Sequence, residues 1–326
     1  MIKDGFGRVH DYLRISLTDN CNLRCNYCMP DEDYHFTAAS KLMQADEIEA
    51  IAKIFVQNGV KKIRLTGGEP LVRKDAADIL MRLAALPVKL TITTNGTRLH
   101  EFADVLQSAG ITSLNISLDT LHREKFALLT RRDLFDQVYS NIELMLQKGF
   151  HVKLNAVAMR GVNDDELIDF VRWTQHAPVH VRFIEFMPFS GNRWEGKTVL
   201  TWHEMLDTIS SAFAIEPLAH VAHDTAKKYK VKNAQGSFAF ITTMSTPFCG
   251  DCNRMRLTAD GKMKNCLFSK TETDLLTAYR EGKDIVPLIL QNIGEKRSAL
   301  GGQFDADIEH VDASHIENRS MITIGG

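Results

Sequence analysis

The first 190 residues alternate between short β-rich runs and segments with helical periodicity. The β-rich runs lie at residues 12–18, 62–66, 90–94, 113–118, 151–158 and 181–187. Helical segments lie between them, at 45–58, 75–86, 100–109, 134–148 and 164–173. Such alternation is typical of parallel βα units. It leaves two candidate architectures, an open doubly wound sheet and a curved, incomplete barrel.

The side-chain pattern of these strands favours the curved barrel. Strands of a parallel sheet that is buried on both faces usually read as continuous apolar runs. Here polar residues recur at every second position, as Arg14, Ser16 and Thr18 do in the first run. The same alternation occurs at Arg64 and Thr66, at Thr91, Thr93 and Asn95, at Asn115, Ser117 and Asp119, and at Lys153 and Asn155. One face of the sheet is therefore expected to line a polar cavity, with helices on the other face.

Four cations, Arg14, Arg64, Lys153 and Arg182, are predicted to point into this cavity. They would suit an anionic ligand. Any one of them could equally be a strand-end charge that reaches solvent, because long side chains extend past apolar surface to water. Their recurrence on several strands favours the ligand. The formal net charge of the chain is only −2, so no general basic field exists for nucleic acid or an anionic membrane.

The pattern changes after residue 190, which predicts a second, smaller part. A loop-like stretch at 191–197 precedes a helix that begins near Trp202, and residues 229–242 read as a hairpin. We therefore expect an α/β fold with an incomplete (βα)6 parallel barrel over residues 1–200. A smaller C-terminal α+β domain would follow over residues 201–326. A chain of 326 residues with 44% apolar content can bury cores of this size.

The six cysteines are predicted to bind metal. The polar residues 1–12 lack a signal segment, and no run of about eighteen apolar residues follows. The sequence thus predicts a cytoplasmic protein that does not act in a membrane. Disulfides are rare in a reducing compartment, and these cysteines fall into two groups of three with short spacings.

The first triad, Cys21, Cys25 and Cys28, follows the first strand, where barrel and open-sheet enzymes place ligands. Its Cys-x3-Cys-x2-Cys spacing can hold three irons of a 4Fe-4S cluster. The fourth iron would be free to chelate S-adenosylmethionine. A tetrahedral zinc site with His10 or His35 as fourth ligand is the alternative. The TGGEP segment at 66–70 has glycines that allow a backbone edge to approach a ligand closely.

The second triad, Cys249, Cys252 and Cys266, has the spacing Cys-x2-Cys-x13-Cys. Taken by itself, this spacing is also typical of a zinc ribbon. Arg254 and Arg256 follow Cys252 by two and four residues, so both would lie on one face of an extended segment.

These motifs together resemble the radical S-adenosylmethionine superfamily and, within it, the GTP 3',8-cyclase family of molybdenum cofactor biosynthesis. The resemblance covers nearly the full chain. It rests on the ordered set FGRVHDYLRISLTDNCNLRCNYCMP, IRLTGGEP, TTNG, LNISLD, RFIEFM, FCGDCNRMRLTADGK, NCLF and a terminal Gly-Gly. It implies a lyase that converts GTP to (8S)-3',8-cyclo-7,8-dihydroguanosine 5'-triphosphate, with S-adenosylmethionine and two 4Fe-4S clusters as cofactors. Asn265 departs from the family, which often has glycine there.

The resemblance also implies which residues form the sites. The cysteines of the first triad would hold one cluster, and those of the second triad another, whose open iron touches the guanine. The S-adenosylmethionine contacts would be Tyr27, Gly68, Ser117 and Met187, with Gly67 and Glu69 as neighbours. The GTP contacts would be Arg14, Arg64, Thr93, Lys153, Arg182, Arg254, the backbone of Met255, and Arg256. The terminal Gly325 and Gly326 would enter the active-site region.

The implied partners are an electron donor such as flavodoxin and a downstream cyclic pyranopterin monophosphate synthase, and a homodimer is a family-level expectation. Two other functions stay open at this point. One is a two-cluster radical S-adenosylmethionine peptide maturase, in which Arg254 and Arg256 would lose their purpose. The other is a zinc-binding module that uses both triads structurally, which metal analysis would reveal.

Overall fold

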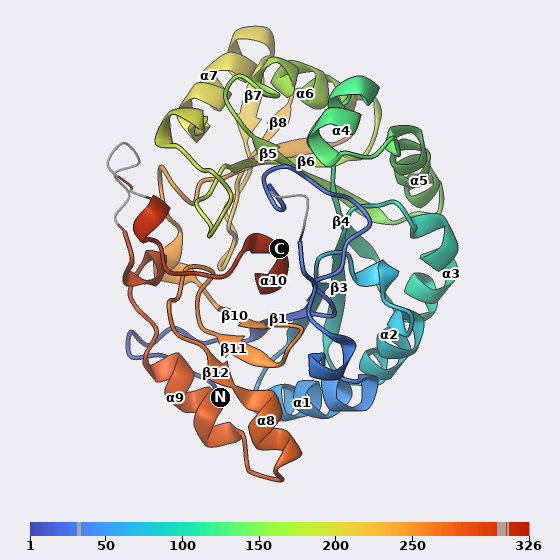
Figure 1. The fold of residues 1–326 in the computed structure, drawn as a ribbon. Coiled ribbons are helices and arrows are strands. Elements are labelled where there is room, and N and C mark those ends of the chain that lie inside the picture. Colours follow the sequence, from blue (N-terminus) through green and yellow to red (C-terminus); the bar gives the residue numbers. More distant parts are fainter. Residues whose placement is uncertain (31–33, 305–310, 312, 326) are drawn as a thin grey trace.

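One curved sheet organises the computed structural model, which describes residues 1–30, 34–304, 311 and 313–325. The sheet has twelve strands in the order β12-β11-β10-β1-β2-β3-β4-β5-β6-β9-β8-β7. Helices surround it on the outside, and the C-terminal helix lies near the centre of the ring of strands (Figure 1). The fold is therefore α/β, and its centre is reached by segments from both ends of the chain.

The predicted barrel strands are confirmed. They are β1 (Tyr12–Ser16), β2 (Lys62–Thr66), β3 (Lys89–Thr94), β4 (Ser113–Ser117), β5 (His151–Ala158) and β6 (His180–Glu185). Each of them pairs in parallel with the next. These six strands do not close into a full circle, so the barrel is incomplete, as the alternating pattern indicated.

Six helices cover the outer face of these strands, and one of them was missed by sequence reasoning. They are α1 (Ala45–Gln57), α2 (Ala76–Ala84), α3 (Leu99–Ser108), α4 (Arg123–Thr130), α5 (Phe135–Gln147) and α6 (Leu167–His176), the last preceded by the short turn η3 (Asp164–Glu166). The missed helix is α4. It begins with a charged Arg-Glu-Lys sequence and ends at Arg131, whose φ of 54° is left-handed without a glycine. The helix therefore lacks a capping side chain at His122 and a glycine at its end, and the acidic Glu124 in its first turn is the one usual signal that it shows.

The residues after 200 extend both edges of the same sheet. Their elements are α7 (Trp202–Ala212), β7 (Ile215–Pro217), β8 (Lys227–Val231), β9 (Ser237–Ile241), β10 (Arg254–Leu257), β11 (Lys262–Lys264), β12 (Thr273–Asp274), α8 (Leu275–Arg280), α9 (Val286–Gly294) and α10 (Met321–Ile324). The predicted hairpin is formed by β8 and β9, which are antiparallel. β9 pairs in parallel with β6, and β10 pairs in parallel with β1. The division of the chain at residue 200 stays a prediction.

Strand register places the apolar and polar positions on opposite faces. Leu13 lies beside Ile63, and Ile63 lies beside Leu90; all three side chains belong to the buried core. Since side chains alternate along a strand, the same register pairs Arg14 with Arg64 on the inner face. The polar inner face that the sequence predicted is thus the wall of the barrel interior. Within the described residues, no helix is both long and apolar enough to cross a membrane.

Candidate active site

The barrel interior contains two adjoining cavities. The first cavity is lined by the first cysteine triad and by the carboxyl ends of strands β2, β3 and β4. The second cavity is lined by the second cysteine triad and by cations of β1, β2, β5, β6 and β10. Four residues line both cavities, namely Thr93, Asn155, Ile184 and Met321. A ligand in one cavity would therefore meet a ligand in the other at these side chains.

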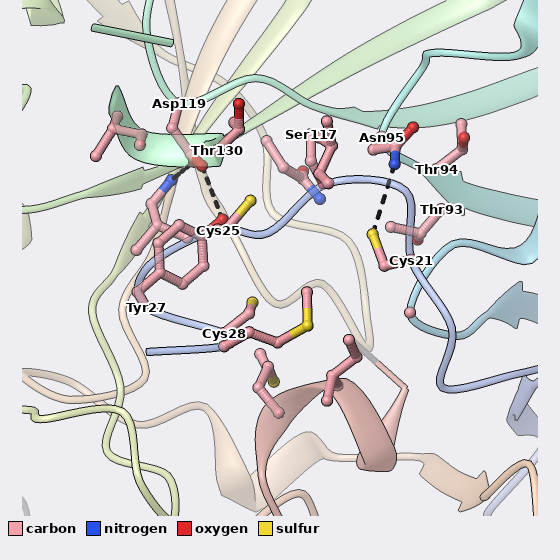
Figure 2. Close-up of a pocket in the computed structure, with 18 of the residues that line it drawn as sticks. Cys21, Cys25, Tyr27, Cys28, Thr93, Thr94, Asn95, Ser117, Asp119 and Thr130 are labelled. Carbon is pink, nitrogen blue, oxygen red and sulfur yellow. Dashed lines mark hydrogen bonds between the residues drawn. The ribbon is translucent and has the colours of Figure 1, made fainter. Parts of the chain in front are cut away.

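The first cysteine loop is held in place by the helix that the sequence did not reveal. Arg24 N and Asn26 N donate to Thr130 O and Leu129 O at the end of α4, at 2.9 and 3.0 Å. Within the loop, the N–H groups of residues 28 and 29 both donate to Cys25 O. These bonds turn the loop so that all three cysteines border the first cavity (Figure 2).

The first triad lies in surroundings that oppose ionisation of its thiols. Burial and the nearby Glu69 raise the pKa of Cys21 to about 11. Burial raises the pKa of Cys25 and of Cys28 well above the ordinary value, and Asp119 acts in the same direction. A bound metal would ionise these thiols, since coordination to a cation deprotonates a thiol outright. The chemistry of this donor set therefore fits a metal group with sulfur ligands.

Gly67 and Gly68 let strand β2 approach the cysteine loop. A Cβ at Gly68 would lie 2.5 Å from both Asp19 O and Asn20 O, and one at Gly67 would lie 2.6 Å from Thr18 O. Gly68 N donates to Thr18 O at 2.6 Å, and residue 69 N donates to Asn20 O at 2.8 Å. The Cβ positions of both glycines therefore face protein backbone, while the residues themselves line the first cavity.

The carboxylate of Glu69 holds neighbouring segments together through hydrogen bonds. Its carboxylate accepts hydrogen bonds from Leu71 N at 3.0 Å, Thr94 Oγ1 at 2.8 Å and Asn95 N at 2.6 Å. Burial raises its pKa to about 7, and these hydrogen bonds oppose the rise. Glu69 thus joins the start of η2 (Pro70–Val72) to the end of β3. Asn95, fixed in this way, donates from Nδ2 to Cys21 Sγ at 3.7 Å.

The sequence placed Asp119 on the polar face of the sheet but gave it no role at the site, and the structure places it in the first cavity. Its Oδ2 accepts a hydrogen bond from Tyr27 Oη at 2.7 Å, and its Oδ1 accepts one from Val157 N at 2.9 Å (Figure 2). Burial raises its pKa to about 6. The polar alternation through Ser117 was the signal for it. Tyr27 and Ser117, both predicted from the resemblance, also line this cavity.

Met187 and Met255 differ in position from the other residues predicted to bind the same ligands. Met187 lines the second cavity and is not among the residues that border the first. The side chain of Met255 is buried in the core, where its residue pairs with Leu13, so only its backbone is left to meet a ligand. The resemblance had likewise implied a GTP contact by the backbone of Met255 and not by its side chain.

The second cavity is densely cationic. Its lining includes Arg14, Lys62, Arg64, Lys153, Arg182, Arg254 and Arg256, with Asp224 as the acidic member among the described residues. Lys62 was missed, although it belongs to the same strand and face as Arg64. Burial and the neighbouring cations lower the pKa of Lys153 to about 8 and that of Arg182 to about 9. An anion in this cavity would remove that mutual repulsion.

Several polar atoms at the second cavity have no hydrogen-bond partner among the described residues. They are Arg14 Nε, Arg182 Nε and Nη2, and the Oδ1 atoms of Asn115 and Asn155. Buried polar groups are normally paired, because an unpaired one costs about 1–3 kcal/mol. Unpaired guanidinium groups together with amide oxygens form a donor and acceptor set for a polar, anionic ligand.

Tyr12 is another residue of this cavity that the sequence did not single out. Arg64 Nε donates to Tyr12 Oη, and Arg64 Nη1 donates to Ile92 O at 3.0 Å and Thr93 Oγ1 at 3.3 Å. Burial opposes ionisation of Tyr12, but the surrounding cations, Arg64 first among them, lower its pKa to about 7. The phenol thus orients Arg64 and lies in the same positive field.

The second triad borders the second cavity from the C-terminal half. Cys249 begins the turn η5 (Cys249–Asp251), and Cys266 follows β11. Burial alone would raise the pKa of Cys252, but Arg254 and Lys296 lower it to about 6. Burial raises the pKa of Cys249. Three sulfur donors beside a cationic cavity fit a second sulfur-ligated metal group.

The C-terminal segment reaches the wall between the two cavities. Arg256 Nη1 donates to Gly325 O at 2.7 Å. Gly325 has a φ of 83°, and a Cβ there would lie 2.8 Å from Ser16 Cβ and from Thr66 Oγ1. Arg319 fastens this segment through ion pairs with Asp260 and Glu272. The other terminal glycine, Gly326, lies outside the described residues.

The fourth ligands considered for a zinc site are placed away from the first triad. His10 Nε2 lies 3.1 Å from Asp4 Oδ2, and burial lowers the pKa of this histidine to about 4. Neither His10 nor His35 is among the residues that line the first cavity. In the described parts of the chain, no three histidine, cysteine, aspartate or glutamate side chains converge on a position for a single metal ion.

Two family models match consecutive parts of the chain. The model described as the Radical SAM superfamily matches residues 15–174, and the model described as Molybdenum Cofactor Synthesis C matches residues 179–300. Together they include both cysteine triads and every cation of the second cavity except Arg14, which lies one residue before the first match.

Relatives from animals, plants and bacteria are similar over the whole chain. Molybdenum cofactor biosynthesis protein 1 of Mus musculus is 46% identical over 99% of this chain. The chain spans about half of that relative, 51% of its length. GTP 3',8-cyclase, mitochondrial, of Arabidopsis thaliana is 45% identical, and the match covers 100% of this chain and 84% of the relative. GTP 3',8-cyclase of Rhodopirellula baltica is 44% identical, with 99% and 91% covered.

A solved structure supports the fold. Streptococcus suis SuiB bound to S-adenosylmethionine superposes with a TM-score of 0.66 at 16% identity, covering 97% of this chain and 78% of SuiB. At this identity the similarity concerns the arrangement of helices and strands alone.

Proposed function

We infer the function from the fact that this chain belongs to the GTP 3',8-cyclase family within the radical S-adenosylmethionine superfamily. It acts as a radical lyase that converts GTP to (8S)-3',8-cyclo-7,8-dihydroguanosine 5'-triphosphate, the first step of molybdenum cofactor biosynthesis. One observation supports this most strongly. A cavity lined by three cysteines adjoins a second cavity that combines three further cysteines with seven cations.

Cys21, Cys25 and Cys28 would hold the first 4Fe-4S cluster, and S-adenosylmethionine would lie beside it in the first cavity. When bound, these groups would supply an electron and a carbon radical that can take a hydrogen atom from a substrate. Asn95 donates a hydrogen bond to Cys21 Sγ, and Tyr27 with Asp119 forms a polar wall opposite. Gly68 and Ser117 line the same cavity and are proposed as further S-adenosylmethionine contacts, whereas Met187 lines the second cavity and is proposed from the family resemblance alone.

Cys249, Cys252 and Cys266 would hold a second 4Fe-4S cluster next to the guanine base. The support for this lies in the donor set and its charge, since three sulfur atoms border a cavity rich in cations. Arg254, the backbone of Met255 and Arg256 follow directly in β10 and would bind the nucleotide beside the cluster.

The cations of the second cavity would bind the triphosphate of GTP. Arg14, Arg64, Lys153 and Arg182 come from four strands of the barrel, so they can surround an anion from several directions. Guanidinium groups offer paired donors to phosphate oxygens, and each charge-assisted bond contributes about 1.5–3 kcal/mol. The unpaired donors of Arg14 and Arg182 are the observed groups that such a ligand would satisfy.

The ribose would then lie at the boundary of the cavities, beside Thr93 and Asn155. These residues line both cavities, as do Ile184 and Met321. Holding the reacting groups in contact at this boundary replaces a bimolecular encounter by an oriented one. Helix α10, which contains Met321, covers the boundary and would exclude water during the reaction.

The proposed partners follow from the reaction. An external reductant such as flavodoxin would supply electrons, a cyclic pyranopterin monophosphate synthase would take the product, and a homodimer and a cytoplasmic location remain expectations from the sequence. None of these partners is needed to test the nucleotide.

The test is anaerobic formation of 5'-deoxyadenosine by the reconstituted, reduced protein with GTP, with ATP and without nucleotide. Strong stimulation by GTP alone is the expected result. Equal formation in all three reactions would contradict the assignment of GTP, and no formation at full iron content would contradict the radical mechanism.

A further inference from the structure

Lys296 is a buried cation that lies against the second cysteine triad and has no part in the proposed reaction. Only 4% of its surface is exposed. It follows helix α9, and its Nζ donates to Cys252 Sγ at 3.5 Å and to Arg254 O at 3.1 Å. The charged groups that act most strongly on it are Cys252, Cys266, Arg8 and Arg254, and no carboxylate is among them.

A buried ammonium group needs a compensating negative charge. Removing it from water is costly unless it is paired, and the two arginines near Lys296 add repulsion. The groups that can carry the compensating charge are the sulfur atoms of Cys252 and Cys266. Lys296 is therefore placed as a counter-ion to whatever anionic group these cysteines hold.

The position of Lys296 is fixed by the packing of α9. Asn292 Nδ2 donates to Thr273 Oγ1 at 2.8 Å, and Asn265 Nδ2 donates to Asn292 O at 2.7 Å. Lys296 N itself donates to Ile293 O at 3.0 Å. The ammonium is thus held at the sulfur by buried secondary structure, and the contact does not depend on a mobile surface side chain.

The two triads differ in the charge around them. The sulfur contact of the first triad comes from Asn95, a neutral amide, and the acids Glu69 and Asp119 lie near its thiols. At the second triad two cations contact Cys252 Sγ, the Lys296 ammonium at 3.5 Å and the Arg254 guanidinium at 3.6 Å, and Lys296 is the one of the two that is assigned no contact with the nucleotide. Hydrogen bonds to cysteine sulfur and local positive charge both stabilise the reduced, more negative state of an iron-sulfur cluster.

We propose that Lys296 is a positioning residue of the second cluster, which acts through Cys252 Sγ to raise the reduction potential of that cluster above the value it would have without the ammonium. The proposal rests on the proposed function in one respect, namely that the second triad holds an iron-sulfur cluster. Among the described residues no cation donates to a sulfur atom of the first triad, since Arg24 bonds to Cys21 O and not to Sγ, so the first cluster serves as the internal reference.

The experiment uses the full-length protein, reconstituted without oxygen, in wild-type form and as Lys296→Met. Iron and sulfide analysis first establishes how many clusters each protein holds. A potentiometric titration followed by electron paramagnetic resonance then gives the midpoint potential of each cluster. A parallel series with Cys21, Cys25 and Cys28 replaced by alanine isolates the signal of the second cluster.

We expect Lys296→Met to retain its iron and to shift the second midpoint potential to a more negative value, with the first potential unchanged. Lys296→Arg should restore much of the shift. The matched control is Lys264→Met, because Lys264 is also buried near Cys266, yet its Nζ bonds to Ser269 O and pairs with Glu272 at 3.5 Å. This control should leave both potentials unchanged.

An unchanged second potential in Lys296→Met at full iron content would overturn the role of Lys296 while leaving the cluster in place. An equal shift in Lys264→Met would overturn it too, since the effect would then not depend on contact with sulfur. If Lys296→Met fails to hold the second cluster, Lys296→Gln is titrated, and the same negative shift is required. Zinc or missing iron at the second triad of the wild-type protein would overturn both this proposal and the proposed second cluster.

Discussion

Replacing Gly68 by alanine should damage the first site by pushing strand β2 away from the cysteine loop. The added Cβ would lie 2.5 Å from the carbonyl oxygens of Asp19 and Asn20, and 2.8 Å from the carbonyl carbon of Asn20. Ordinary contact begins near 3.4 Å, so the two backbones must separate by about 0.9 Å (3.4 minus 2.5). Both contacts are with backbone, which cannot rotate out of the way as a side-chain tip would.

The cost has two parts. Overpacking of this kind costs about 1–3 kcal/mol. The separation also stretches the hydrogen bonds from Gly68 N to Thr18 O and from Glu69 N to Asn20 O, each contributing roughly 1 kcal/mol. We therefore expect Gly68→Ala to lower the free energy of unfolding by about 2–4 kcal/mol. Because Asn20 adjoins Cys21, the same displacement should lower iron content at the first triad.

The assay combines urea unfolding of the protein with iron analysis after reconstitution. Gly294→Ala is the matched control, because it lies at the end of α9 with no atom within 4 Å of the added Cβ. It should leave stability and iron content near those of the wild type. A Gly68→Ala protein with wild-type stability and wild-type iron content would refute the reasoning.

Three further perturbations test other parts of the molecule. The unfolding free energy of the wild type should fall as pH falls from 6.5 to about 4, because burial lowers the pKa of His10 to about 4 and only the unfolded chain takes up the proton in this range. The contribution is up to about 3 kcal/mol. A His10→Gln variant whose stability depends on pH as steeply as that of the wild type would contradict this prediction. Arg256→Ala should raise the KM for GTP roughly 10- to 100-fold without loss of either cluster, because a charge-assisted hydrogen bond contributes about 1.5–3 kcal/mol. Wild-type steady-state kinetics in this variant would exclude Arg256 as a GTP contact. A short tag appended after Gly326 should leave iron content intact and lower turnover, because Gly325 has so little free space that a Cβ on it would lie 2.8 Å from Ser16 Cβ and from Thr66 Oγ1. Unchanged turnover would remove the role of the terminal glycines.

The barrel strands could be predicted because their signal is local. Strands β2 and β5 have the bounds that the side-chain pattern gave, and most of the polar positions in the alternation line the cavities, whereas Ser16, Thr18 and Thr91 do not. The alternation of Leu13, Arg14 and Ile15 already separates the core from the interior of the barrel. Period and turn chemistry were sufficient for this part of the fold.

The sheet edges could not be predicted in the same way. β10 pairs with β1 across about 240 residues of sequence, and β9 pairs with β6 after the intervening α7, β7 and β8. Such pairings depend on tertiary contacts that no local pattern encodes. The pairing of β10 with β1 also brings Arg254 and Arg256 into the barrel wall, which no local pattern indicated, while the division of the chain at residue 200 stays a prediction.

The candidate site was predicted for residues that belong to motifs and missed for residues that act through neighbours. Lys296 reaches Cys252 across 44 positions of sequence, and only the packing of α9 places it there. Asp119 and Tyr12 lie beside predicted residues, and their chemistry depends on burial and on partners across the sheet. Sequence spacing identifies the ligands of a group more readily than the residues that set its electrostatic environment.

The central claim is that the two cavities bring the ribose of GTP to a radical formed at the first triad. The most direct measurement is the fate of deuterium in GTP labelled at ribose carbon 3', followed by mass spectrometry of the 5'-deoxyadenosine produced anaerobically by the reduced protein. The account expects one deuterium in 5'-deoxyadenosine, together with a product that has the mass of cyclised GTP and lacks the label. Unlabelled 5'-deoxyadenosine formed alongside unconverted GTP would contradict it.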